Sequence, residues 1–167
     1  NDPRRHKLKV LSTLLGDGSS SRLFQAVREK LGMTYQINTF LNSYLDVSAF
    51  GVYYSTNEKQ AGKVNEIVHR EFSKLRNIEV KPKELTRVKE YIKGNTLMSL
   101  ESTTNRMIRL ANSLLHYGKI VPIEDVLVKI DSVTSEDIQK LSNEVLNEST
   151  LSKIIICSKD NSIKKAA

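Results

Sequence analysis

The residues best suited to chemistry stand close together in the stretch LGDGSSSRLFQAVREKLGMTY, residues 15–35. Arg28 and Tyr35 are seven residues apart, with Arg28 in a predicted helix and Tyr35 at the start of the strand that follows. This spacing lets a guanidinium and a phenol converge on one spot, where both can donate hydrogen bonds to a peptide carbonyl and stabilise an oxyanion. Arg–Tyr pairs are also common on protein surfaces, so these two residues alone leave a structural role open.

The glycines and serines of the same stretch offer other chemistry. Gly16 and Gly18 bracket Asp17, a pattern too short for a dinucleotide-binding fingerprint, and no Gly-Lys-Ser/Thr follows it. Free amides at the next helix start could bind an anion or a carbonyl, but a plain turn is the simpler interpretation. The serines at 19–21 lack the Gly-x-Ser-x-Gly elbow of a hydrolase nucleophile, so we expect one of them to cap a helix.

The sequence predicts neither a catalytic zinc site nor a cysteine nucleophile. The three histidines, His6, His69 and His116, are far apart, and none belongs to a His-x-x-Glu-His pair. We therefore expect this chain to bind no catalytic zinc. The single cysteine, Cys157, follows three isoleucines with no basic residue beside it, so we expect a buried thiol rather than a nucleophile.

Composition excludes several classes of function. The 167 residues carry a formal net charge of +7, and 39% of them are hydrophobic, which fits one globular domain. No apolar run approaches the roughly 20 residues that span a bilayer, so no membrane association is expected. Aromatic residues are only 6% and the basic ones are spread out, which argues against nucleic-acid binding. The first residues lack a secretory signal, so we expect the cytoplasm, with an organelle matrix as the alternative.

The elements that must position these residues follow from hydrophobic periodicity. Helices are predicted over 3–16 and from the serines to Gly32, the second with Leu23, Phe24, Val27 and Leu31 facing inward. Residues 34–44 and 47–56 predict two antiparallel strands that turn near residues 44–46. Gly51 weakens the second strand or lets another backbone approach closely.

Five helices and a final strand are predicted next. The helices cover 57–76, the segment opened by Pro82, a segment with Met107, Leu110, Ala111 and Leu114 inward, residues 123–130, and a segment that a Thr134–Asp137 capping box begins. Residues 151–158 predict a strand covered on both faces, and 159–167 a polar tail. The fold class is therefore α+β, with helices packed on one face of a largely antiparallel sheet. A strand from before Asn1 would complete this thin sheet, so residues 1–158 are predicted to be an N-terminally incomplete domain.

Together these motifs resemble a known family. The stretch at 15–35, then SAFGVYYST, LESTTNRMIRL and YGKIVPIEDVLVKIDSVTSEDIQKLSNEVL, are similar in order to the C-terminal domain of pitrilysin/insulinase-type zinc peptidases. That family includes the mitochondrial processing peptidases and many bacterial relatives. The resemblance covers roughly residues 11–146.

The resemblance implies a divided active site. Family members pair similar α/β domains that close like a clam shell around a peptide, and the N-terminal domain carries zinc on a His-x-x-Glu-His motif. Arg28 and Tyr35 match the Arg/Tyr pair that the C-terminal domain contributes, and Gly16, Asp17 and Gly18 match the glycine-rich loop on the substrate side. Asp17 stands where relatives often have glycine, which favours basic substrate segments. Arg22 also matches the family, and we interpret it as a structural residue, either in an ion pair or at a helix terminus, rather than a substrate contact.

The function implied is that of a C-terminal domain of a zinc endopeptidase, inactive by itself. Its expected partners are a peptide or unfolded-protein substrate and an N-terminal zinc-binding domain or partner subunit, with a dimer expected. The alternative is a catalytically silent scaffold, like the core subunits of respiratory complexes that share this fold.

Overall fold

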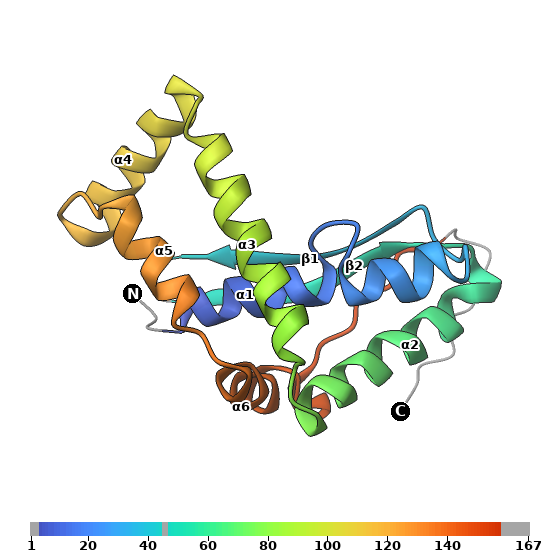
Figure 1. Cartoon of the computed structure of the whole chain (residues 1–167). Coiled ribbons are helices and arrows are strands. Elements are labelled where there is room, and N and C mark those ends of the chain that lie inside the picture. The colour runs from blue at the N-terminus through green and yellow to red at the C-terminus, as the bar shows by residue number, and fades with distance from the viewer. Residues whose placement is uncertain (1–3, 45–46, 158–167) are drawn as a thin grey trace.

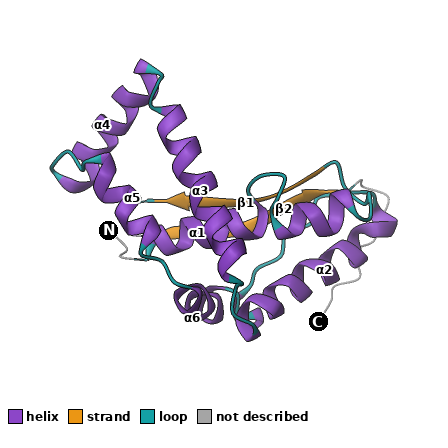
Figure 2. Cartoon of the chain, in the orientation of Figure 1, coloured by secondary structure: helices purple, strands orange, loops and turns teal. Residues whose placement is uncertain are grey.

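The computed structural model of the chain describes residues 4–44 and 47–157. It combines helices with a two-stranded antiparallel sheet, which confirms the α+β class (Figures 1 and 2). Among these residues no helix is both long and apolar enough to cross a bilayer. The elements in chain order are α1 (Arg5–Gly16), the π-helix η1 (Phe24–Glu29), β1 (Gln36–Ser43), β2 (Ser48–Ser55), α2 (Glu58–Asn77), α3 (Pro82–Ser99), α4 (Thr103–Tyr117), α5 (Ile123–Asp131), α6 (Ser135–Val145) and the 3₁₀ turn η2 (Glu148–Thr150).

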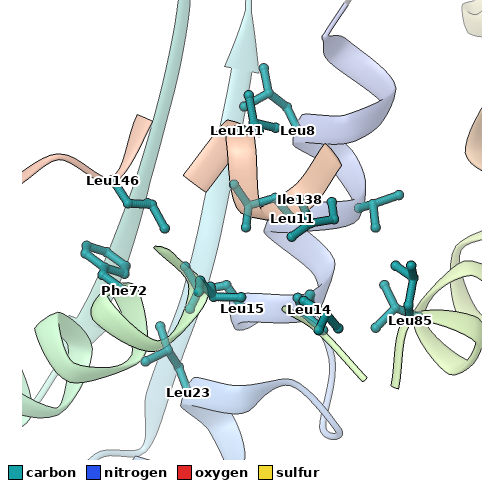
Figure 3. Packing of buried hydrophobic residues seen from close by; sticks show 14 of the residues in the cluster. Leu8, Leu11, Leu14, Leu15, Leu23, Phe72, Leu85, Ile138, Leu141 and Leu146 are labelled. Atoms are coloured by element: carbon teal, nitrogen blue, oxygen red, sulfur yellow. The ribbon is translucent and has the colours of Figure 1, made fainter. Parts of the chain in front are cut away.

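Helix α1 is the centre of the core. Leu11 and Leu15 are fully buried, as the predicted apolar stripe requires, and α1 contacts β1, α3, α5 and α6. Figure 3 shows the α1 leucines among Phe72 of α2, Leu85 of α3 and Ile138 of α6. Burying a leucine or isoleucine side chain contributes about 1.5–3 kcal/mol, so this contact of four helices provides much of the stability of the domain.

The two strands pair as predicted, with Ile37 opposite Tyr54 and Phe40 opposite Gly51. Ile37 and its same-face neighbours pack on the core, while Phe40 and Tyr53 on the other face are exposed. A Cβ on Gly51 would lie 2.6 Å from Cζ of Phe40, so the glycine makes room for a side chain. The predicted close approach at Gly51 is therefore made by an aromatic ring and not by another backbone. The turn residues 45–46 lie outside the described residues.

The predicted final strand is wrong within the part that the structure describes. Residues 151–157 join no ladder, and Ile154 and Ile156 are 88% and 95% exposed. Cys157 is also exposed, against the expectation of a buried thiol. A run of isoleucines favours a strand only when a neighbouring strand pairs with it and side chains cover its faces. Within residues 4–44 and 47–157 the sheet consists of β1 and β2, and residues 151–157 pair with neither. The tail at 159–167 lies outside the described residues.

Helix α4 forms where predicted, but its apolar face is not inward. Met107 and Leu114 are 63% and 51% exposed, and Ser113 is the residue of this helix that is buried. In Figure 1 α4 and the end of α3 form an arm that projects from the rest of the domain. Helical periodicity predicts which residues share a face, but the packing partner of that face depends on tertiary structure.

The remaining predicted helices are confirmed. Pro82 is the first residue of α3, and Leu85, Val88 and Ile92 are its buried residues. The Thr134–Asp137 capping box begins α6 with both of its reciprocal hydrogen bonds. These signals are local, so they hold whatever surrounds the helix.

Candidate functional site

Ser21 closes the loop after α1 with two hydrogen bonds to one carbonyl oxygen. The Ser21 hydroxyl donates a 2.7 Å hydrogen bond to the carbonyl oxygen of Gly18, and the Ser21 amide donates to the same oxygen at 3.2 Å. Gly18 has a φ of +90°, a left-handed conformation that glycine adopts without strain. No side-chain cap is present at the start of η1, whose N-cap is Leu23. Ser21 does stand at the predicted cap position, because Arg22 and Leu23 are helical and the Gln25 amide donates to the Ser21 carbonyl at 3.0 Å. Its hydroxyl, however, hydrogen-bonds backward to the loop.

Two contacts tie η1 to the rest of the domain. Leu23 and Val27 are fully buried, whereas Leu31, predicted to face inward, is 45% exposed because η1 ends at Glu29. Arg22 forms a bidentate pair with Glu84 of α3, with N–O distances of 2.9 and 2.8 Å. This hydrogen-bonded guanidinium lowers the pKa of Glu84. Of the structural roles predicted for Arg22, the ion pair is the one observed.

Arg28 lies in the last turn of η1 with its side chain exposed. Its guanidinium carbon lies 4.7 Å from the centroid of the Phe24 ring, one turn earlier. A cation–π contact at an exposed site contributes about 0.5–1 kcal/mol. Among the described residues no carboxylate pairs with Arg28, so its positive charge is not offset by an ion pair there, and its side chain is exposed.

Tyr35 is placed by the residue before it. The single proton of the buried Thr34 hydroxyl is shared between the carbonyl oxygens of Gln36 and Ser55, and the hydroxyl oxygen accepts a 3.1 Å hydrogen bond from the Gln36 amide. These bonds fix the entry into β1. Tyr35 itself is 94% exposed, so its phenol is free to reach a ligand.

The structure does not join Arg28 to Tyr35 directly. Within the described residues no hydrogen bond or ring contact links the two side chains. A short turn separates them, in which the Gly32 amide donates to the Arg28 carbonyl at 3.0 Å and the Met33 amide to the Val27 carbonyl at 3.1 Å. Both side chains are exposed, Arg28 within this hydrogen-bonded turn and Tyr35 two residues after it, and their convergence on a ligand stays a prediction.

The glycine loop is held close to the sheet. Gly16 is buried, and a Cβ there would lie 2.7 Å from the backbone nitrogen of Thr39 in β1. The Asp17 carboxylate pairs with Lys9 at 3.1 Å and accepts a 3.5 Å hydrogen bond from Thr13. Gly16 thus lets α1 approach β1, and the negative charge of Asp17 is partly balanced inside its own helix.

A tyrosine that the sequence analysis did not single out borders this loop. A Cβ on Gly18 would lie 2.9 Å from the hydroxyl of Tyr91 in α3. Tyr91, Asp17 and Lys9 line a hollow of about 170 Å³. Tyr91 follows the buried Val88 by three residues on α3, which is the one sequence signal that places it toward the core side of that helix. The hollow offers a phenol, a carboxylate and an ammonium at the surface of the loop.

Metal ligands do not gather in residues 4–44 and 47–157: no three histidine, cysteine or carboxylate side chains could hold an ion. His6 is half-buried and accepts a 3.0 Å hydrogen bond from Nε of Arg5. Its pKa is lowered to about 4, chiefly by burial and then by the charges of Arg5 and Lys129. His69 lies 3.7 Å from a carboxylate oxygen of Glu148.

Comparison with known sequences now places the chain. The sequence model of the family described as "Peptidase M16 inactive domain" matches residues 1–92. An uncharacterized zinc protease of Streptomyces coelicolor is 35% identical over 145 residues, which are 87% of this chain and 32% of that protein. The uncharacterized zinc protease YmxG of Bacillus subtilis is 32% identical over 145 residues, 87% of this chain and 36% of that protein. The chain therefore spans about a third of the length of these relatives.

Solved structures share the fold. A crystal structure titled as a peptidase M16 inactive domain from Pseudomonas fluorescens matches with a TM-score of 0.75 and 21% identity, over 87% of this chain and 35% of that one. A chain of complex III2 from Candida albicans matches with a TM-score of 0.75 and 19% identity, over 86% of this chain and 36% of that one. With the family match to residues 1–92, these findings show that the chain belongs to the M16 family of zinc peptidases, as part of a C-terminal domain of the type described as inactive.

Proposed function

We propose that this chain supplies the substrate-binding half of a divided peptidase active site, while zinc is held by another domain or by a partner chain. The observation that carries the proposal is the pair of exposed donors, Arg28 in the last turn of η1 and Tyr35 just before β1. Their positions match the pair that the family resemblance predicts. The zinc-protease names of the relatives support a metal-dependent reaction in the complete protein.

The two side chains would act on the carbonyl of the peptide bond to be cleaved. Zinc, when bound in the complete enzyme, supplies Lewis acidity and an activated water. The Arg28 guanidinium and the Tyr35 phenol would donate hydrogen bonds to the carbonyl oxygen, and these bonds strengthen as negative charge develops there. The stack on Phe24 and the hydrogen-bonded turn reduce the freedom that the donors lose on binding.

The loop of Gly16, Asp17 and Gly18 would lie along the substrate. The buried Gly16 would contribute by holding the loop against β1, and Gly18 and Asp17 by contacting the peptide. Because Lys9 pairs with Asp17 at 3.1 Å, the preference for basic substrate segments would be modest. Peptides and unfolded protein segments are the proposed substrates, in an endopeptidase reaction.

The test uses the intact protein with zinc and a peptide substrate. Arg28→Ala and Tyr35→Phe are each expected to lower turnover by about 10²–10³, the usual cost of one oxyanion donor, with the zinc content unchanged. Lys30→Ala is the matched control, an exposed cation in the same turn. Unchanged turnover in both variants would refute the role, and an intact protein with neither zinc nor turnover would instead be a silent scaffold.

We also propose how this chain fits into the larger assembly. A strand from residues before Asn1 would pair with the present sheet and complete the domain at 1–158, and the zinc half would face it within a dimeric, clam-shell protein of the cytoplasm. Co-purification separates the arrangements: a zinc-bearing partner chain would place the metal in trans, whereas one long zinc-bearing chain would place it in cis. An added strand would slow the amide hydrogen exchange of β1 and β2 in the longest natural form of the protein, compared with residues 1–167 alone. Equal exchange rates in the two proteins would contradict the added strand.

A further inference from the structure

A second and larger hollow lies apart from the Arg28 and Tyr35 segment. It has a volume of about 620 Å³ and is formed by the start of α1, the connection between α4 and α5, and α5 itself. We propose that this hollow, which we call the basic pocket, binds a small anion with two or more phosphate or carboxylate groups. Its lining residues are Arg5, His6, Lys7, Tyr117, Lys119, Ile120, Val121, Pro122, Asp125, Lys129, Ser132 and Val133.

The positive charge of the basic pocket is only partly compensated. Four cations line it against the single carboxylate of Asp125. Lys7 is paired with Asp137 of α6 at 2.7 Å. Across residues 4–44 and 47–157, no carboxylate forms an ion pair with Arg5, Lys119 or Lys129. Three cations that surround one hollow repel one another, and a multivalent anion would relieve that repulsion.

Arg5 is fixed by neutral groups. Its guanidinium carbon lies 4.4 Å from the centroid of the Tyr117 ring, and it donates hydrogen bonds to the Tyr117 hydroxyl and to Nε2 of His6. The low pKa of His6, about 4, keeps that imidazole uncharged near neutral pH, so it can accept this bond. The guanidinium is thus held in place by neutral groups, which leave its positive charge available to an anion. Its remaining N–H groups suit the planar oxygens of a phosphate or carboxylate.

The loop that carries Lys119 is also held in place. The Ser113 hydroxyl is buried, donates to the Lys119 carbonyl at 2.8 Å and accepts from the Val121 amide at 2.8 Å. Gly118 ends α4 with a φ of +66°, which turns the chain into this loop. The backbone of the pocket wall is therefore ordered before any ligand binds, which lowers the entropic cost of binding.

The dimensions of the basic pocket suit a small molecule. Ligand sites commonly span about 300–1,000 Å³, and the 620 Å³ of this hollow falls in that range. Lys119 and Lys129 are exposed and can move their ammonium groups toward an anion, while the apolar Val121 and Pro122 border the organic part of a ligand. Phosphate and carboxylate share the chemistry recognised here, and the experiment below separates them.

The test is calorimetric titration of the intact, metal-free protein with inorganic pyrophosphate and with citrate, at constant ionic strength. Metal is removed because both anions chelate divalent ions. Saturable binding of one or both anions is expected, and the stronger binder identifies phosphate or carboxylate as the source. Lys119→Gln and Lys129→Gln are each expected to weaken binding about tenfold, equivalent to ~1.4 kcal/mol. Lys153→Gln, an exposed lysine outside the pocket, is the control.

Two results would overturn the proposal. One is the absence of saturable binding of both anions to a folded protein. The other is binding that Lys119→Gln and Lys129→Gln leave unchanged, because the anions would then bind elsewhere. Neither lysine belongs to the Arg28 and Tyr35 segment, so peptidase turnover is a separate readout that reports on the proposed function alone.

Discussion

A single methyl group at Gly16 tests the contact between helix α1 and strand β1. In Gly16→Ala the new Cβ would lie 2.7 Å from the Thr39 backbone nitrogen and 2.8 Å from its Cγ2. Backbone in a paired strand cannot move aside as a flexible side chain can. Overpacking costs about 1–3 kcal/mol, and a clash with backbone belongs to the upper part of that range, about 2–3 kcal/mol. The helix propensity of alanine offsets ~1 kcal/mol of it. We expect a net destabilisation of about 1–2 kcal/mol.

The matched control is Gly62→Ala in the second turn of α2. Among the described residues no atom outside its own helical surroundings lies within 4 Å of a Cβ at that position. The same substitution is therefore expected to stabilise the protein by about 0.5–1 kcal/mol, because alanine loses less entropy than glycine in a helix. The same glycine-to-alanine substitution is thus expected to lower the stability of the protein at Gly16 and to raise it at Gly62.

Thermal unfolding of both variants measures the difference. A change of 1 kcal/mol shifts Tm by about 2–4 °C in a protein of this size, so Gly16→Ala should melt about 2–8 °C below the wild type and Gly62→Ala slightly above it. The reasoning is refuted if Gly16→Ala melts at or above the wild-type Tm. Circular dichroism at low temperature must first show that both variants are folded.

Other substitutions probe the core and the titrating groups. Ile138→Ala empties a fully buried position and should cost about 2–5 kcal/mol in chemical denaturation, whereas Ile154→Ala, at an 88% exposed residue, should change stability by less than ~0.5 kcal/mol. The pKa of Glu84 lies below its ordinary value of 4.5, so its contribution to stability is full above that pH and is lost as the pH falls further. Glu84→Gln should therefore flatten the acid side of a stability–pH profile, and a profile identical to the wild type would contradict the ion pair. Lys129→Gln removes a cation that lowers the pKa of His6, so NMR titration should show that pKa rising from about 4; a further fall would contradict the sign.

Local signals made most of the helices and both strands predictable. The capping box of Thr134 and Asp137, the first-turn Pro82 and the alternation around Ile37 each act over a few residues, and each has the predicted outcome. The strand expected at 151–158 and the inward face expected for α4 depend on surfaces far away in sequence. Nothing in the local pattern of residues 151–157 distinguishes a paired strand from an exposed one.

The residues of the candidate sites also fall into those that the sequence predicts and those that only the structure shows. Arg28 and Tyr35 are found from the sequence because they occupy one contiguous stretch, and their exposure is a result of the structure. Tyr91 approaches the glycine loop only through the packing of α3. The basic pocket joins residues 5–7 to residues 117–129, and no spacing rule links segments so far apart. Sequence reasoning therefore finds sites built within one segment and misses sites built between segments.

The contact between Gly51 and Phe40 has an evolutionary consequence. The Phe40 ring occupies the space that any side chain at position 51 would need, since a Cβ there would lie 2.6 Å from the ring. A larger residue at position 51 requires the Phe40 ring to turn away or to be replaced by a smaller side chain, whereas a smaller residue at position 40 needs no change at Gly51. Homologues with a larger residue at the position of Gly51 are therefore expected to carry a smaller one opposite it, so that the two positions covary while the strand pairing between them is kept.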